Sequence, residues 1–421
     1  MKNLKALFDP QLSHSFQLLK EKNLKGLIYP FWSFTQGFQA LGIQSAYHKV
    51  IRKKERKPIW LYSDRIDAGG DNAEAFFEYC VKHRPDIEHV FIINDSSSDA
   101  TRLSKLGQII EPKSNQHKLF FLLAEKYFLS CPENYFLNPF GLKKPAYNDL
   151  PTPDLVFLQH GITQNDLSDW LKRDKMNFSR IVTAAQKEYD AFLDAPYGYT
   201  KSNLIKCGFP RFDKLTNAPE NKIVIMPTWR QNITGKVNSR TCLPEYNPEF
   251  KKSDYFKFYF DLLNDKKLAC AMEKRGVTGE FYLHQSLAAQ IDDFSSPIFE
   301  IMHPPYNYTQ AFATGNLLVT DYSSVAFDFG YLGKPVLYCQ FDKDSIYGSD
   351  NHTFTKNYIS AEEDGFGPVV YDYASIVKEI LCFMEHDFSV SPKYSQRSKS
   401  FYFYHDRNNC KRLLAAISKE T

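Results

Sequence analysis

The chain of 421 residues lacks the apolar segments that direct proteins to secretion or anchor them in a bilayer. Its first residues, MKNLKALFDPQLSHSF, contain no continuous apolar run of the kind that signal peptides carry. Nowhere do about 18 uncharged apolar residues follow one another, which is the length that a membrane-spanning helix needs. We therefore expect a protein that is made and kept in the cytoplasm.

Paired cysteines, a strong charge excess and the common nucleotide and metal motifs are also missing. The eight cysteines stand singly without CxxC spacing, a distribution typical of reduced thiols in a reducing compartment. A formal net charge of only +3 argues against a dedicated nucleic-acid-binding protein. No Walker loop, GxGxxG, HExxH or GxSxG motif occurs. No spacing of acidic, histidine or cysteine residues indicates a bound metal.

What the chain does contain is a regular alternation of strand-like and helix-like segments. With 421 residues and 43% hydrophobic content, it is long enough for two packed domains. The alternation starts at Pro58 and predicts an α/β fold with parallel sheets covered by helices on both faces. We predict two Rossmann-like domains facing a cleft, over residues 58–216 and 217–421. The strand-like runs are PIWLYS, HVFIIN, KYFLS and DLVFLQ in the first domain, and KIVIM, FYLH, IFEIM, NLLVT and PVLYC in the second.

Residues 1–57 differ in composition from the rest of the chain. They combine aromatic residues between Tyr29 and Phe38 with the basic run HKVIRKKERK at residues 48–57. Aromatic rings beside a positive run fit the headgroup region of an anionic membrane. An amphipathic helix that packs on the first domain and carries a solvated charge run fits the same sequence. Both interpretations stay open at this point.

Ligands of open α/β sheets bind beyond the carboxyl ends of the strands, so the residues that directly follow each apolar run are the candidates for chemistry. His160 and Gly161 follow DLVFLQ. A histidine there can accept a proton from a hydroxyl nucleophile near neutral pH. Glycine permits an unusual backbone angle or a close approach of substrate. The structural alternative is a histidine that only caps the end of a strand.

A second candidate segment, PTWR, follows the strand-like run KIVIM. It contains Thr228 and Arg230. Arginine at the end of a strand can hold a phosphate through two parallel hydrogen bonds and stays charged throughout turnover. An ordinary surface arginine is equally compatible with so short a pattern.

A third candidate segment follows NLLVT, where Asp321, Ser323 and Ser324 form a polar turn before a helix. Two hydroxyls beside free backbone N–H groups at the start of a helix make an anion site. Capping of the helix by one of the two serines is the structural alternative, and it does not exclude phosphate binding by the other.

Two histidines end strand-like runs in the second domain. His284 ends FYLH, and His303 ends IFEIMH before two prolines. Either side chain can donate a hydrogen bond to a phosphate oxygen. Each of them, taken alone, fits a structural role as well.

These segments resemble, in the same order, those of the CDP-glycerol glycerophosphotransferase family, whose members build teichoic acids and related capsule polymers. The similarity covers about residues 58–375, and its most specific part is TDYSSVAFDFGYLGKPVLY. It is supported by WLYSDRIDAGGDNAEAFF, FLNPFG, LQHGIT, GFPRFD and PTWR. The resemblance implies a GT-B type fold with the CDP-linked donor held mainly by the second domain.

The resemblance also implies roles for the candidate residues. An acceptor hydroxyl attacks the β-phosphorus of the donor, and CMP leaves. His160 is then the general base, Arg230, Ser323 and Ser324 hold the pyrophosphate, and Asp321 orders the turn. The second histidine of the family usually precedes a proline. We favour His284 for this role although glutamine follows it, because His303 with its proline lies closer to TDYSS than usual.

The implied partners follow from the family. They are CDP-glycerol or CDP-ribitol as donor and a lipid-linked or polymeric acceptor. Because no spanning helix is expected, the basic run in residues 1–57 adds an anionic surface on the inner face of the bacterial membrane as an expected partner. No further cofactor and no nucleic acid is implied. The segment HGITQND departs from the family, whose better-known polymerases have a lysine there, so the preference for acceptor or polyol can differ. A GT-B glycosyltransferase that uses a nucleotide sugar is the alternative enzyme, and a non-catalytic assembly factor at the membrane is the alternative class.

Overall fold

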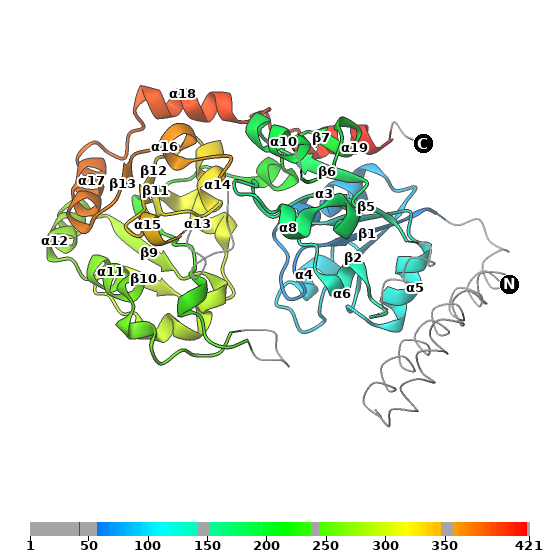
Figure 1. Ribbon diagram of the computed structural model, residues 1–421, viewed down its shortest axis with the longest axis horizontal. Coiled ribbons are helices and arrows are strands. Elements are labelled where there is room, and N and C mark those ends of the chain that lie inside the picture. Colours follow the sequence, from blue (N-terminus) through cyan, green and yellow to red (C-terminus); the bar gives the residue numbers. More distant parts are fainter. Residues whose placement is uncertain are drawn as a thin grey trace. The chain divides into compact units, whose positions relative to one another are not determined.

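The computed structural model describes residues 42, 57–141, 152–194, 196–237, 244–346 and 357–418. This part of the chain forms two parallel sheets with helices packed on them (Figure 1). The α/β fold class predicted from the alternating pattern is therefore confirmed. The aromatic and basic segment over residues 1–57 lies outside the described residues, apart from Gly42 and Lys57.

The first sheet has seven strands in the order β3-β2-β1-β4-β5-β6-β7. The runs PIWLYS, HVFIIN, KYFLS and DLVFLQ supply β1, β2, β4 and β5, as predicted. The register places β1 between β2 and β4, with parallel pairing on both sides. The strands are β1 Ile59–Ser63, β2 Glu88–Ile92, β3 Gln108–Ile110, β4 Lys126–Leu129, β5 Asp154–Phe157, β6 Arg180–Thr183 and β7 Leu204–Lys206.

Residues at the ends of the helices between these strands stabilise them through capping hydrogen bonds and charges. In α3 (Asn72–His83), the carboxylate of the preceding Asp71 accepts a hydrogen bond from the first N–H. Glu74 lies in the first turn and Lys82 in the last, and each charge is opposite in sign to the helix dipole at that end. The further helices are α4 Ala100–Ser104, α5 Asn115–Leu123, α6 Asn134–Leu137, α8 Ser168–Leu171, α9 Arg173–Met176 and α10 Gln186–Leu193.

The second sheet has six strands in the order β10-β9-β8-β11-β12-β13, and its pairs are parallel. The predicted runs KIVIM, FYLH, IFEIM, NLLVT and PVLYC supply β8 to β12. The order of the strands matters for function, because β8 and β11 are neighbours although about 90 residues separate them in the chain. The strands are β8 Lys222–Ile225, β9 Thr278–Tyr282, β10 Phe299–Met302, β11 Gly315–Thr320, β12 Val336–Cys339 and β13 Val369–Val370.

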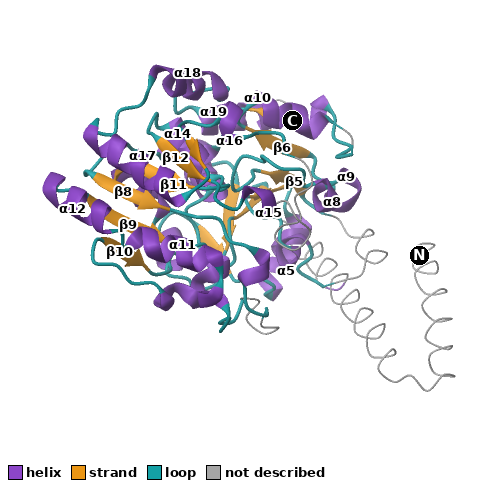
Figure 2. Cartoon of the chain, turned by 60° about the vertical axis from the view of Figure 1, so that its left-hand side comes forward, coloured by secondary structure: helices purple, strands orange, loops and turns teal. Residues whose placement is uncertain are grey.

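Helices cover both faces of this second sheet (Figure 2). Alternate strand residues such as Ile223 and Ile225 belong to one apolar cluster with α11 and α17. Val224, between them, points to the opposite face, where Phe329 of α14 also approaches Gly315. The helices are α11 Asp254–Leu263, α12 Lys266–Arg275, α13 Tyr308–Thr314, α14 Val325–Tyr331, α15 Lys343–Ile346, α16 Ala361–Asp364, α17 Tyr373–Glu385, α18 Pro392–Phe401 and α19 Asn409–Ser418.

The chain divides into two compact units. The first unit comprises Met1–His160 and Phe178–Ile181, and the second comprises Gly161–Asn177 and Val182–Thr421. The boundary therefore passes between His160 and Gly161 and again through β6.

None of the helices in the described part of the chain has the length and apolar character that crossing a bilayer requires. The amphipathic helix α17, for example, has only 13 residues and packs on β12.

Candidate functional site

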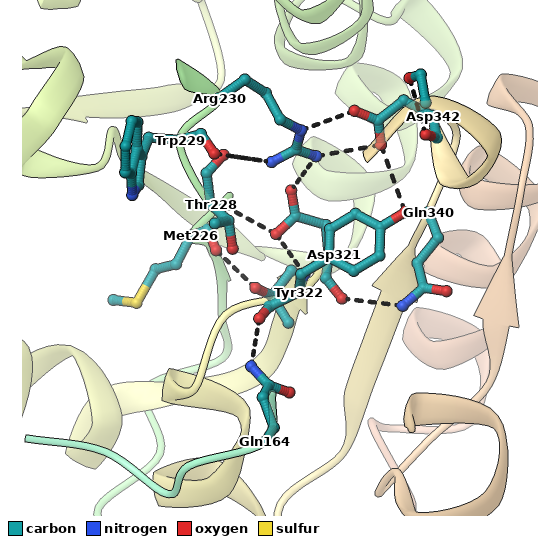
Figure 3. Close-up of polar contacts among 11 residues, drawn as sticks. Gln164, Met226, Thr228, Trp229, Arg230, Asp321, Tyr322, Gln340 and Asp342 are labelled. Carbon is teal, nitrogen blue, oxygen red and sulfur yellow. Dashed lines mark hydrogen bonds and ion pairs between the residues drawn. The ribbon is translucent and has the colours of Figure 1, made fainter. Parts of the chain in front are cut away.

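Polar residues gather at the carboxyl ends of β8, β11 and β12 in the second unit (Figure 3). Strand β8 leads into Thr228 and Arg230, β11 leads into Asp321 and Tyr322, and β12 leads into Asp342. The strands are adjacent in the sheet, so residues from three distant parts of the sequence meet at one edge. This is the edge at which parallel α/β sheets bind ligands.

Asp321 is the centre of this cluster. Its side chain is fully buried, and its Oδ1 accepts hydrogen bonds from the backbone N–H groups of Thr228 (2.8 Å) and Tyr322 (2.6 Å). Its Oδ2 accepts from Nη2 of Arg230 at 2.8 Å. A single carboxylate thus joins the segment after β8 to the turn after β11.

Arg230 is buried beside this carboxylate, and protein acceptors take all of its N–H groups. Nη2 donates to Asp321 and also to Asp342 Oδ1 at 3.2 Å, and Nε donates to Asp342 Oδ2 at 2.7 Å. Nη1 donates to the carbonyl oxygens of Thr228 (2.8 Å) and Trp229 (3.3 Å). Guanidinium has five N–H donors, and these five contacts use them. The arginine here holds the two aspartates and the local backbone.

The two carboxylates keep Arg230 charged in spite of its burial. Burial by itself would lower the pKa of the guanidinium, but the neighbouring charges of Asp321 and Asp342 outweigh this effect and raise the pKa well above its usual range. The ring of Tyr322 lies 5.2 Å from the guanidinium carbon and adds a cation–π contact. Breaking this buried network from one side would leave an unpaired charge inside the protein.

The hydroxyl groups predicted to bind phosphate stand next to Asp321. Ser323 Oγ accepts a long hydrogen bond, 3.4 Å, from the N–H of Val325 at the start of α14. Ser324 is the N-cap residue of α14, but its side chain makes no capping bond. In the described part of the chain, the Thr228 hydroxyl oxygen is buried and has no hydrogen-bond partner. The structure therefore brings Thr228, both serines and Asp321 together.

His284 lies near this cluster, whereas His303 does not. The imidazole of His284 stacks on Trp229 with ring centroids 6.1 Å apart, and its Nδ1 accepts from the N–H of Ser286. A neutral ring with Nδ1 as acceptor carries its proton on Nε2. His303 follows the edge strand β10, is exposed, and lies 3.0 Å from Oδ1 of Asp292 through its Nε2.

The HG segment begins at the end of β5. Gln159 is buried with a left-handed φ of 63°, and the exposed His160 follows it. His160 ends one stretch of the first unit, whereas Gly161 opens the second unit. Within the second unit, Gln164 donates through Nε2 to the carbonyl oxygen of Tyr322 at 2.6 Å. The part of HGITQ that lies in the second unit thus contacts the turn after β11 directly.

A small pocket lies beside this turn, within the second unit. One side is formed by the turn after β11 and by α14, and another by residues near α16. Polar groups from Gln164, Ser323 and Gln340 line it together with the rings of Phe327 and Tyr338. Such a mixture of aromatic walls and a few polar groups is typical of small-molecule sites.

The segment GFPRFD has a structural role in the second unit. Arg211 donates from Nε and Nη2 to both carboxylate oxygens of Asp328 in α14, at 2.8 and 2.9 Å. Asp213 accepts the first N–H groups of α19, from Asn409 at 2.9 Å and Cys410 at 2.8 Å. These contacts fix α14 and α19, so this segment supports the site without forming part of it.

Asp342, Gln340 and Gln164 take part in the network but were not predicted as site residues. The signal was present for Gln340 and Asp342, because both follow the strand-like run PVLYC just as Asp321 follows NLLVT. Gln164 stands in the loop after β5, where only its hydrogen bond to Tyr322 reveals its role. Within the described ranges, no group of three or more histidine, cysteine, aspartate or glutamate residues is placed to hold a metal ion.

The sequence matches the family model described as CDP-Glycerol:Poly(glycerophosphate) glycerophosphotransferase over residues 45–419. It is 33% identical over 417 residues to the minor teichoic acid biosynthesis protein GgaB of Bacillus subtilis (strain 168), covering 95% of this chain but 45% of GgaB. It is 23% identical to the teichoic acid glycerol-phosphate transferase of Staphylococcus aureus (strain NCTC 8325 / PS 47), covering 80% of this chain and 86% of that protein. The chain therefore spans less than half the length of GgaB.

The fold is similar to that of a variant of the wall teichoic acid polymerase TagF. The TM-score is 0.63 at 15% identity, covering 98% of this chain and 97% of TagF. A UDP-N-acetylglucosamine 2-epimerase gives a TM-score of 0.52 at 10% identity, covering 87% of this chain and 96% of the epimerase. At such identities the likeness concerns the fold alone, and the likeness to TagF confirms the GT-B type that the resemblance implies.

Proposed function

The chain belongs to the CDP-glycerol:poly(glycerophosphate) glycerophosphotransferase family, and on that basis we propose that it is an enzyme of teichoic-acid-like polymer synthesis. It transfers glycerol phosphate from CDP-glycerol to a hydroxyl of the growing polymer and releases CMP. The observation that carries this proposal is the family match over residues 45–419, which contains all of the site segments. CDP-ribitol is the alternative donor, and a capsular polymer is the alternative acceptor.

In the proposed reaction the acceptor oxygen attacks the β-phosphorus of the donor. A new P–O bond forms to the acceptor, and the bond between the β-phosphorus and the bridging oxygen breaks. CMP departs with the bridging oxygen and its electron pair. His160 takes the proton of the acceptor hydroxyl, a role supported by its exposed position at the end of β5. The polymer thereby gains one glycerol phosphate unit, joined through a new phosphodiester bond.

The pyrophosphate of the donor binds at the turn after β11. Ser323 and Ser324 contact its oxygens, and Thr228 belongs to the same site. Arg230 contributes mainly by holding Asp321 and Asp342, because a direct phosphate contact would require it to give up one of the acceptors that it now holds. His284 donates from Nε2 to a phosphate oxygen and is favoured over His303, which lies exposed beside Asp292.

The acceptor is polymeric or lipid-linked, so the protein works at the inner face of the cell membrane. The basic run at residues 48–57 is the segment suited to an anionic surface. Peripheral attachment of this kind is part of the proposal.

The test is a donor assay with the purified chain. CDP-glycerol, CDP-ribitol and a UDP-sugar are offered with a teichoic acid acceptor, and release of CMP or UDP is followed. We expect CMP from CDP-glycerol and incorporation of glycerol phosphate into polymer. Release of UDP alone would instead support the nucleotide-sugar transferase, and no release from any donor would support a non-catalytic assembly factor.

The role of His160 is tested in the same assay. We expect His160→Ala to lower turnover by about two to four orders of magnitude while CDP still binds, since binding and proton transfer use different groups. His386→Ala, which changes an exposed histidine after α17, is the matched control and should behave as wild type. A folded His160→Ala protein with wild-type turnover would refute the base assignment.

A further inference from the structure

Asn72, at the start of α3 in the first unit, is a fully buried asparagine whose side chain reaches a distant backbone segment. Its Nδ2 donates to the carbonyl oxygen of Gln159 at 2.6 Å and to that of Leu158 at 3.4 Å. These carbonyls belong to the end of β5, almost 90 residues later in the sequence. Asn72 therefore connects α3 directly to the backbone that precedes His160.

The end of α3 that carries Asn72 is itself held in place. Asp64, which follows β1 and is fully buried, accepts from the backbone N–H of Asp71 at 3.0 Å and of Glu74 at 3.2 Å through Oδ2. Its Oδ1 accepts from the N–H of Ala73 at 2.9 Å. The amide of Asn72 thus projects from a helix end that is bonded to the sheet on which His160 stands.

The backbone that Asn72 holds has an unusual conformation. Gln159 has a φ of 63°, in the left-handed region that non-glycine residues seldom adopt. Its side chain is 1% exposed, whereas the next residue, His160, is exposed. The left-handed residue Gln159 therefore stands directly between the buried end of β5 and the exposed histidine.

We propose that Asn72 is a positioning residue that holds the Gln159 turn and thereby sets the place of the His160 imidazole. The inference rests on the proposed function, because it takes His160 as the general base. Without the amide of Asn72, the carbonyl oxygens of Leu158 and Gln159 lose the hydrogen bonds that tie them to α3, and the left-handed backbone at Gln159 is held less firmly. The imidazole then no longer stands where the acceptor hydroxyl needs it, and a small displacement of a catalytic group lowers turnover strongly.

The experiment is a double-variant cycle with the full chain. Release of CMP from CDP-glycerol is measured for wild type, Asn72→Ala, His160→Ala and the double variant. We expect Asn72→Ala to lower kcat at least about tenfold with KM for CDP-glycerol changed less than about twofold. In the His160→Ala background the same change should have an effect of less than about threefold, because a residue that acts through another adds nothing once that partner is gone.

Two further variants complete the design. Asn72→Leu has the branching of asparagine but lacks the N–H donors and adds no charge, so it should reproduce the kinetic effect and decides the question if the alanine variant does not fold. Asn264→Ala is the matched control, because that amide also joins two carbonyls, of Phe260 and Ser295, each at 2.9 Å. It lies outside the site and should leave kcat unchanged.

The outcomes distinguish two hypotheses, that His160 is the general base and that Asn72 positions it. If the single variant His160→Ala keeps wild-type turnover, His160 is not the general base. The positioning role of Asn72 is then refuted as well, because it depends on that assignment. If His160→Ala is impaired but Asn72→Leu keeps wild-type kcat, only the role of Asn72 is refuted. Equal loss of kcat in both backgrounds would also refute it, because Asn72 would then act independently of His160.

Discussion

Ser324 lies so close to Gly161 that a Cβ atom added to the glycine would stand 2.5 Å from Ser324 Oγ and 3.0 Å from Ser324 Cβ. The sequence left open whether Gly161 permits an unusual backbone angle or a close approach. The structure shows a close approach, and the approaching group is a serine of the same unit. Glycine at 161 therefore leaves the room that the Ser324 side chain occupies in this structure.

Gly161→Ala should displace Ser324 and weaken donor binding. A misfit of this size in a packed site costs about 1–3 kcal/mol, which corresponds to a loss of CDP affinity of about five- to 150-fold. Calorimetric titration with CDP measures the loss. In a Ser324→Gly background the space for the new Cβ exists, so Gly161→Ala should have little additional effect there. An equal loss in both backgrounds would mean that the clash is not the cause.

Removal of Arg230 should destabilise the second unit as well as impair donor binding. Arg230→Ala leaves Asp321 buried without its partner, which costs about 3–5 kcal/mol of unfolding free energy. Arg84→Ala is the control, because solvent screens its pair with the exposed Asp86, so this variant should change the unfolding free energy far less. Urea denaturation compares the two variants.

Asp342 distinguishes a positioning role of Arg230 from direct phosphate binding. Asp342→Asn removes one charge partner of Arg230 and one of the two carboxylate oxygens that accept from the guanidinium. If Arg230 acts by ordering the Asp321 turn, CDP affinity should fall in this variant too. Unchanged or tighter CDP binding in Asp342→Asn would favour direct contact between Arg230 and phosphate.

The two histidines of the second unit should differ in their effect on donor use. His284→Ala removes a ring that stacks on Trp229 next to the site and should reduce kcat/KM for CDP-glycerol by about tenfold or more, as loss of a hydrogen bond to a charged group does. His303→Ala changes an exposed side chain at the sheet edge and should lower it less than about twofold. Steady-state measurement of kcat/KM for both variants tests this prediction. A larger loss in His303→Ala than in His284→Ala would assign the phosphate contact to His303.

Stability should fall in mild acid because of a buried histidine in the first unit. Burial, assisted by the nearby charge of Lys118, lowers the pKa of His117 to about 3. An unfolded chain binds the proton near pH 6.5, so from there downward the unfolded state is favoured by about 1.4 kcal/mol per pH unit. Between pH 6.5 and 5 this amounts to about 2 kcal/mol. His117→Phe should lose that part of the pH dependence in urea denaturation, whereas the exposed control His83→Phe should keep it.

Membrane attachment is tested with anionic and neutral vesicles. Each lysine or arginine near an anionic surface contributes about 1 kcal/mol, so the basic run at residues 48–57 should bind anionic vesicles at low salt and release them as salt is added. The chain without residues 1–57 is the control and should stay in solution. Equal sedimentation of both chains, or of neither at low salt, would refute a membrane role for this segment.

The sequence by itself determined where the strands lie and which residues follow them. Apolar runs such as NLLVT and KIVIM are buried on both faces, and this pattern depends only on local spacing. The rule that ligands bind beyond the carboxyl ends of strands then selected Thr228, Asp321 and the two serines, which the structure does bring together. Local information was sufficient for these assignments because each concerns a strand and the turn directly after it.

Only the tertiary structure decided which of these residues are partners. The order of the second sheet places β8 beside β11, and this pairs Arg230 with Asp321 across 91 positions of sequence. It also leaves β10 at the edge, which separates His303 from the cluster. Contacts of Gly161 with Ser324 and of Asn72 with Gln159 likewise join segments far apart in the chain. Such pairings depend on how strands are ordered and packed, and no pattern within a short stretch of sequence contains that information.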